Sequence, residues 1–149
     1  MDSQEDRDIE TIRPTLLAKV AGAALIGVGA FTLLLGAQTY MVVRLTPMTL
    51  TILALLVLSG GAALGFGTKV VRMYGWAAVG GTVAAGLTAV VGASWFLLAL
   101  LNGMFSPLAF FVPAGATVAA VLSGVTIPPG RKADAARERL RDAGLEAGA

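Results

Sequence analysis

The feature that most restricts how this chain can fold is a long stretch without negative charge. All nine acidic residues lie in the first 10 or the last 16 positions, so residues 11–133 contain no carboxylate. Basic residues divide this stretch into uncharged runs at 20–43, 45–68 and 73–130. About 20 apolar residues in a helix suffice to cross a bilayer, and each run is at least that long. The sequence therefore predicts an integral membrane protein.

The overall composition agrees with that prediction and removes several kinds of chemistry. Hydrophobic residues make up 56% of the 149 positions and charged residues 13%, against about 25% charged residues in soluble domains. Sixteen of the 19 glycines lie at positions 22–124, inside apolar sequence, which is not the pattern of a linker or a collagen repeat. The chain has no cysteine and no histidine, which excludes disulfides, thiolate catalysis and imidazole catalysis.

Turn-forming residues divide the longest uncharged run into two spans. Asn102, Gly103, Ser106 and Pro107 lie near its middle and are typical of a tight turn. We therefore expect an all-α fold, an integral membrane protein built as a four-transmembrane-helix bundle. The predicted spans are residues 14–43, 47–67, 75–101 and 107–127. They make up a membrane domain at 14–130, between an N-terminal tail or interfacial helix at 1–13 and a C-terminal tail at 131–149.

Proline and hydroxyl residues mark where three of the spans should begin. Pro14, Pro47 and Pro107 fall at the first position of a predicted span, where the missing N–H breaks no helical hydrogen bond. Thr46 and Ser106 precede two of these prolines and favour N-caps, because their hydroxyl oxygens can accept from free backbone N–H groups. The sequence thus predicts defined starts for spans one, two and four.

The basic residues predict the orientation of the bundle. Ten of the 11 Lys and Arg residues precede span one, separate spans two and three, or follow span four. Arg44 is alone on the opposite side. Because cytoplasmic loops carry an excess of Lys and Arg, both termini should be cytoplasmic. The Ala-, Gly- and Arg-rich composition favours a multi-pass protein of a bacterial plasma (inner) membrane.

The predicted spans carry no ionisable group at membrane depth. Such groups usually mark proton relays, substrate sites or metal sites in membrane proteins. A proton-coupled drug exporter needs a membrane carboxylate, as do carboxylate metal sites and paired acid–base catalysis. We therefore expect no catalytic residue, no cofactor and no metal ligand. The serine and threonine hydroxyls of the spans are expected to bond to the preceding turn of their own helix or to a neighbouring helix.

Two polar residues near the outer side each allow two interpretations. Gln38 could hold two helices together or line a path for a neutral solute. It lies only six residues from Arg44, however, so a place at the membrane interface is the favoured interpretation. Arg44 could contact a lipid phosphate or an anionic substrate, but a lone arginine at a membrane rim usually extends to the headgroups. Neither residue by itself assigns a function.

Small residues recur on span three at four-residue intervals. Ala77, Gly81, Ala85, Ala89 and Ala93 form one row, and shorter rows on other spans include Gly61 with Gly65. Small residues let helix backbones approach closely in a bilayer, so span three should be the central packing helix. The predicted helix-packing residues are Gly81, Ala85, Ala89, Gly61 and Gly65. Whether these rows close one protomer or join it to another molecule is left open by the sequence.

The tails carry charge but no recognised soluble motif. Residues 128–130 (Pro-Pro-Gly) should end span four, and residues 131–143 favour a solvated helix near the headgroups or one that docks to a partner. Ile9, Ile12 and Leu16 recur at helical spacing and predict a short interfacial helix. Neither tail contains a phosphate-binding loop, a metal motif or a nucleic-acid-binding motif. The candidate lipid-headgroup contacts are Arg44, Lys69, Arg72, Arg131 and Lys132.

These observations favour one functional hypothesis and one alternative. The first is a non-enzymatic accessory or assembly subunit of a membrane complex, with the lipid bilayer and another membrane protein, or a second copy, as partners. The alternative is a homo-oligomeric channel or transporter for a neutral or lipidic solute. No nucleic-acid partner is expected. A lipid-modifying enzyme is a distant third, because the spans lack a general base.

Overall fold

The computed structural model describes residues 3–42, 46–104 and 106–144, and these residues form six helices without a β-strand. Four of the helices are long and apolar enough to span a membrane. This confirms the expected all-α four-helix bundle. The helices are α1 (Ser3–Ile12), α2 (Leu16–Val42), α3 (Pro47–Val71), α4 (Gly75–Leu101), α5 (Pro107–Val125) and α6 (Ile127–Asp142).

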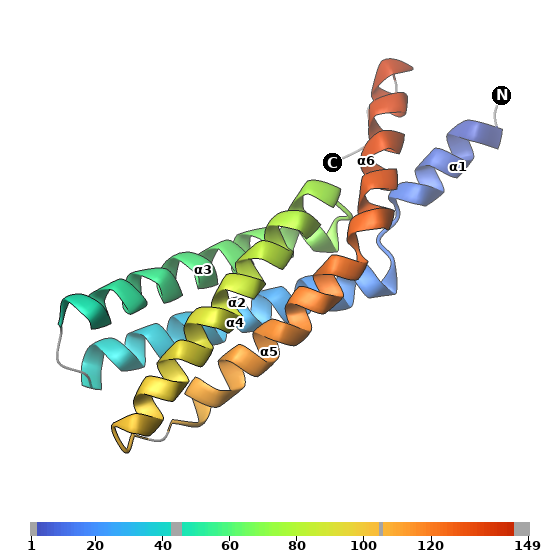
Figure 1. The fold of residues 1–149 in the computed structure, drawn as a ribbon. Helices are drawn as coiled ribbons and strands as arrows, with labels where there is room; N and C mark the ends of the chain where they lie inside the picture. The colour runs from blue at the N-terminus through green and yellow to red at the C-terminus, as the bar shows by residue number, and fades with distance from the viewer. Residues whose placement is uncertain (1–2, 43–45, 105, 145–149) are drawn as a thin grey trace.

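The four long helices run alternately up and down the bundle (Figure 1). Helix α2 packs against α3 and α5, and α4 packs against the same two neighbours. The α2–α5 and α3–α4 contacts therefore lie on opposite sides of the bundle. Helices α1 and α6 extend beyond the bundle at one end, where they lie beside each other (Figure 1).

The starts of the spans follow the sequence prediction at Pro47 and at Pro107, where Ser106 takes the N-cap position, and depart from it at Pro14. Thr46 forms a capping box at α3: its Oγ1 accepts from the backbone N–H of Thr49 at 3.2 Å, and Thr49 Oγ1 accepts from that of Thr46 at 2.7 Å. Pro14 does not begin a helix, because Thr15 Oγ1 accepts from the backbone N–H of Ala18 and α2 begins at Leu16. The hydroxyl of Ser106 makes no cap hydrogen bond.

Two boundaries also lie elsewhere than expected. Helix α3 continues to Val71, about one turn past the predicted end. Span four ends earlier, since α5 stops at Val125 and the backbone N–H of Thr126 bonds to the Ser123 carbonyl. The Pro-Pro-Gly sequence at 128–130 therefore does not separate span four from the tail. It lies in the first turn of α6, where prolines need no N–H partner.

The core of the bundle depends on close contact between α2 and α3. A Cβ added to Gly29 would lie 2.6 Å from the carbonyl oxygen of Gly60, and one added to Gly22 would lie 2.7 Å from that of Gly67. In each helix these glycines are seven residues apart, which is two helical turns. The two backbones therefore meet along a seam that admits no side chain.

Helix α4 contributes a second set of small buried residues. Ala77 and Ala85 are fully buried, and a Cβ added to Gly81 would lie 2.7 Å from Leu25 Cδ1 and 3.0 Å from Ser123 Oγ. Ala89 is half-buried and Ala93 is exposed. Gly81 and Ala85 thus face other helices of the same protomer, while the four-residue row turns outward at its far end. A four-residue step exceeds one helical turn, so such a row drifts around the helix.

Candidate functional site

The interior of the bundle holds few polar groups, and four of its buried hydroxyls are bonded to helix carbonyls. Thr32 donates to Val28 at 2.7 Å, Thr88 donates to Ala84 at 2.9 Å, and Ser59 makes a weaker bond of 3.4 Å to Leu56. Ser123 donates to the Ala78 carbonyl at 2.9 Å and so joins α5 to α4. A hydroxyl committed in this way stabilises helix packing and is not placed as a nucleophile.

The described residues contain no cluster of three or more acidic, histidine or cysteine side chains that could hold a metal ion. Gln38 is exposed near the end of α2, and its Oε1 accepts from the hydroxyl of Ser106 at 3.4 Å. This contact lies at the end of the bundle opposite α1 and α6 (Figure 1). The bond joins the end of α2 to the residue before α5, and both interpretations of Gln38 stay predictions. Arg44 lies outside the described residues.

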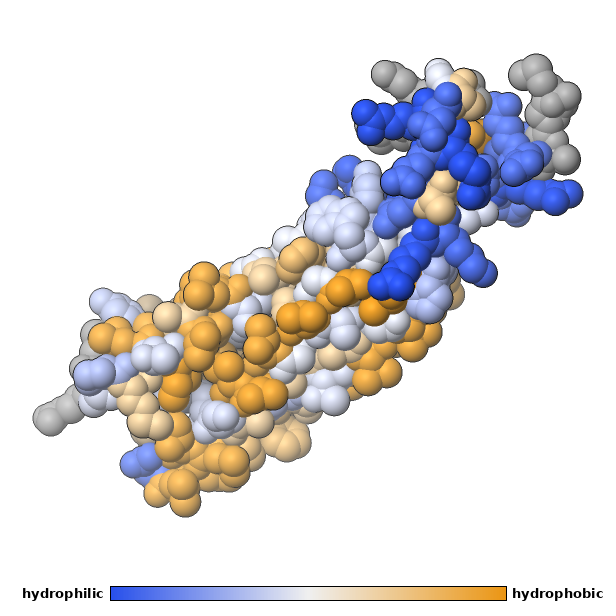
Figure 2. All heavy atoms as spheres, turned by 45° about the horizontal axis from the view of Figure 1, so that its top comes forward, coloured by the Kyte–Doolittle hydropathy of each residue, from blue (hydrophilic) through white to orange (hydrophobic). Residues whose placement is uncertain are grey.

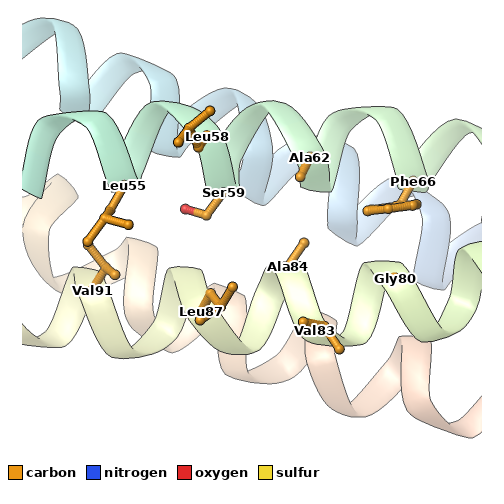
Figure 3. A pocket seen from close by; sticks show the side chains of 10 residues that line it. All are labelled: Leu55, Leu58, Ser59, Ala62, Phe66, Gly80, Val83, Ala84, Leu87 and Val91. Atoms are coloured by element: carbon orange, nitrogen blue, oxygen red, sulfur yellow. The ribbon is translucent and has the colours of Figure 1, made fainter.

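A groove lies between α3 and α4 on the surface of the spans, and we call it the α3–α4 groove (Figure 3). Its volume is about 500 Å³, within the range of roughly 300–1,000 Å³ typical of ligand pockets. The residues that line it include Leu55, Ala62 and Phe66 on α3 and Gly80, Leu87 and Val91 on α4. Ser59 contributes the one hydroxyl of the lining, so the groove is almost wholly apolar.

Small residues on both helices create this groove. Ala62 and Ser59 on α3 face Gly80 and Ala84 on α4, and none of them is large enough to fill the space between the helices. The ring of Phe66 lies over Gly80, where an added Cβ would come within 2.5 Å of the ring. Phe66 therefore closes the groove at one end. This end is the one nearer the turn between α3 and α4.

A second apolar groove of about 510 Å³ lies between α2 and α5, and we call it the α2–α5 groove. Gly27 and Phe31 line it from α2, and Phe111 and Gly115 line it from α5. Phe110 does not line it but packs edge-on against Phe96, with ring centroids 5.7 Å apart. The two grooves lie on opposite sides of the bundle, because their helix pairs do.

The structure divides the predicted packing residues between the interior and the outer surface. Gly81 and Ala85 lie inside the protomer, as described above. Gly61 and Gly65 are exposed, and a Cβ added to either would meet nothing within 4 Å. Close packing at these two positions would need another molecule. The glycines that meet within the protomer, Gly22, Gly29, Gly60 and Gly67, were not among the predicted packing residues.

The hydrophilic residues gather at the end that carries α1 and α6 (Figure 2). The four described candidates for headgroup contact are all exposed: Lys69, Arg72, Arg131 and Lys132. The amino nitrogen of Lys69 lies 5.8 Å from the centre of the Tyr74 ring, within the range of a cation–π contact. Lys69 and Arg72 thus lie at the end of α3, and Arg131 and Lys132 lie near the start of α6; their contact with lipid headgroups stays a prediction.

Arg137 anchors α6 to the turn between α3 and α4. Its guanidinium donates to the carbonyls of Arg72 at 2.6 Å and Met73 at 3.0 Å, and it stacks 4.2 Å from the centre of the Tyr74 ring. The same group pairs with Asp134, whose other oxygen accepts from the backbone N–H of Gly75 at 2.9 Å. These bonds satisfy carbonyls at the end of α3 and an N–H at the start of α4.

Helix α1 is held to α6 by a buried carboxylate. Asp8 is only 8% exposed and accepts two hydrogen bonds from Arg139, at 2.6 and 3.0 Å. These hydrogen bonds hold the pKa of Asp8 below its ordinary value of 3.8. The buried face of α6 consists of Gly130, Ala133, Ala136 and Leu140, and its neighbours are chiefly α4 and α1. The helix expected at 131–143 is therefore present as α6, with one face exposed and the other packed against α4 and α1 of the same chain.

Acidification is expected to release α1 from α6. Since docking lowers the pKa of Asp8, the pair contributes its full stabilisation above about pH 3.8 and loses it as the pH falls through the lowered pKa. Spin labels at Thr11→Cys and Arg141→Cys can report the distance between the helices, because the native chain has no cysteine. The distance distribution should stay narrow at pH 4 and broaden only as the pH falls through the lowered pKa of Asp8, below 3.8. In the Asp8→Asn variant it should be broad already at neutral pH and change little on acidification.

Comparisons with known proteins give no relative for this chain. No family model matches it. Neither the curated proteins nor the solved structures provide a match. The evidence for its function therefore lies in the two grooves, the hydrophilic end at α1 and α6, and the contacts between helices.

Proposed function

We propose that this chain is a non-enzymatic accessory or assembly subunit of a membrane complex. The observation that carries the proposal is the contrast between its interior and its outer surface. The described interior is packed with apolar residues and backbone-bonded hydroxyls. The outer surface, in contrast, has the α2–α5 groove and an exposed strip of α3 at Gly61 and Gly65, where no side chain projects from these two positions. In lipid, small residues and open grooves favour helix association, because backbones can approach closely there.

The proposal includes an orientation and a membrane. Both termini face the cytoplasm, and the membrane is a bacterial plasma (inner) membrane. The support is the charge asymmetry of the sequence, together with the gathering of hydrophilic residues at the end of α1 and α6 (Figure 2). On this orientation, the docked pair α1 and α6 forms a cytoplasmic platform beneath the bundle.

A homo-oligomeric channel or transporter for a neutral or lipidic solute is the second candidate. Large buried side chains such as Leu25, Leu35 and Leu56 fill the bundle, so a solute path would have to run between copies. The exposed strip at Gly61 and Gly65 is the observation that favours this candidate, since two copies could approach closely there. The two candidates differ in what contacts this strip.

Site-specific photo-crosslinking in cells tests the proposal. A photoreactive amino acid at Val118, in the α2–α5 groove, or at Gly65 should crosslink to one distinct membrane protein. The same residue at Leu97, which is 59% exposed and lines neither groove, is the matched control and should not. The crosslinked protein should also copurify in mild detergent and be lost with Gly115→Leu, which fills the groove. Crosslinks only to a second copy of the chain would favour the channel or transporter. The absence of any crosslink at both Val118 and Gly65 would contradict both candidate functions.

A further inference from the structure

A cationic rim lies just beyond the closed end of the α3–α4 groove. Lys69 follows Phe66 by three residues on α3, which places it roughly 4.5 Å farther along the helix axis. On the facing helix, Trp76 precedes Gly80 by four residues. Phe66 and Trp76 contact each other edge-on with centroids 6.1 Å apart, and Trp76 lies 6.1 Å from Tyr74. A row of aromatic rings therefore connects the closed end of the groove with Lys69.

The positive charge at this rim is not neutralised by the residues around it. Within the described parts of the chain, no ion pair joins Lys69 or Arg72 to a carboxylate. Asp134 is the nearby acid, and it is occupied by Arg137 and the backbone N–H of Gly75. Arg137 is itself committed to Asp134 and two carbonyls. The two exposed side chains thus present positive charge outward.

We propose that the α3–α4 groove holds an acyl chain of an anionic phospholipid whose phosphate contacts Lys69 and Arg72. Each half of the site matches one half of that molecule. The groove is open to the surroundings along exposed Val83 and Leu87 and is lined almost wholly by hydrocarbon, which suits an acyl chain. Basic residues near the ends of membrane helices attract acidic headgroups, and Trp76, 56% exposed, lies at headgroup level as interfacial tryptophans do.

Other occupants match only half of the site. An apolar partner helix would fill the groove but leave the two cations without a counter-charge. A free phosphate would satisfy the cations but leave the groove unused. The lipid belongs to the leaflet at the charged end of the bundle, whichever side of the membrane that is. The inference goes beyond the proposed function, because it needs no protein partner.

Native mass spectrometry of the purified full chain in neutral detergent tests this inference. Titration with phosphatidylglycerol should show one bound lipid with a preference over phosphatidylcholine carrying the same acyl chains. Lys69→Gln and Arg72→Gln should each weaken phosphatidylglycerol binding by about fivefold, the effect of one cation near a membrane surface. They should weaken phosphatidylcholine binding less, because the choline ammonium offsets the charge of its phosphate. Ala62→Phe should weaken the binding of both lipids, because the ring fills the groove; Val83→Trp is a second groove variant at a more exposed position.

Matched controls use the same changes elsewhere on the chain. Ala54→Phe adds the same ring to an exposed position of α3 outside the groove, and Arg141→Gln removes a cation from the far end of α6. Both should bind like the native chain. A preference for phosphatidylglycerol that survives in the Lys69→Gln, Arg72→Gln double variant would overturn the assignment of the phosphate. Unchanged binding in both Ala62→Phe and Val83→Trp would overturn the assignment of the acyl chain.

Discussion

Replacing Gly29 by leucine is expected to separate α2 from α3 and to lower the free energy of unfolding by about 3 kcal/mol or more. A Cβ at Gly29 would already lie 2.6 Å from the Gly60 carbonyl oxygen and 2.9 Å from the Leu64 backbone nitrogen. Both atoms belong to helix backbone, which cannot rotate away as a side chain can. The decrease in the free energy of unfolding can be measured in mixed micelles of increasing denaturing-detergent content, with circular dichroism reporting the helix that remains.

The same chain supplies two controls for this prediction. Gly27 is two residues away on α2, and Gly61 is next to Gly60 on α3, yet a Cβ at either position would meet nothing within 4 Å. Gly27→Leu and Gly61→Leu add the same bulk to the same helices and should unfold close to the native transition. If Gly29→Leu is as stable as Gly27→Leu, the backbone seam between α2 and α3 does not hold the hairpin together.

The spans could be predicted from the sequence because charge marks where a helix leaves the membrane. Uncharged runs bounded by Lys19, Arg44, Lys69 and Arg72 indicated two of the spans, and the turn formers at 102–107 divided the third run into the other two. Helix α3 ran past its predicted end because Lys69 lies on the helix itself, where a long side chain can extend to the interface. Thr46 was predictable because its cap is local in sequence.

The packing faces could not be predicted in the same way. In a membrane protein both the interior and the lipid-facing surface are apolar, so hydropathy does not separate them. Four-residue and seven-residue glycine spacings then compete as packing patterns. Gly61 and Gly65 satisfy the first and are exposed, whereas Gly60 and Gly67 satisfy the second and meet α2. Which pair of glycines is buried depends on the angle at which α2 crosses α3.

The docking of α1 against α6 could not be predicted from the sequence either. Asp8 and Arg139 are 131 positions apart, and nothing local indicates that they pair. Asp134 and Arg137 have the three-residue spacing of an ordinary surface pair on a helix, yet both also bond to the turn between α3 and α4. The α2–α5 groove shares this origin, because it arises where small residues of two helices far apart in sequence, such as Gly27 and Gly115, come together.

Replacing Gly130 by leucine is expected to detach α6 from the bundle while the four spans stay folded. A Cβ at Gly130 would lie 2.7 Å from Gly75 Cα and 3.1 Å from its nitrogen, so the start of α6 could not remain against the start of α4. Overpacking of this kind costs about 1–3 kcal/mol. Trypsin cleavage after Arg137 should therefore accelerate by roughly five- to hundredfold, because cleavage follows the population of the opened helix.

Two variants show whether faster cleavage comes from losing the contact between the starts of α6 and α4. Ala135→Leu adds bulk on the exposed face of α6 and should be cleaved at the native rate. Arg137→Lys would keep a trypsin site but lose the planar group that donates to two carbonyls at once, so it should resemble Gly130→Leu. Because α4 is the only one of the four described spans that α6 contacts extensively, a chain ending at Gly130 should still insert as a helical bundle. Loss of span helicity in Gly130→Leu would mean that α6 is needed to fold the bundle and does not merely dock on it.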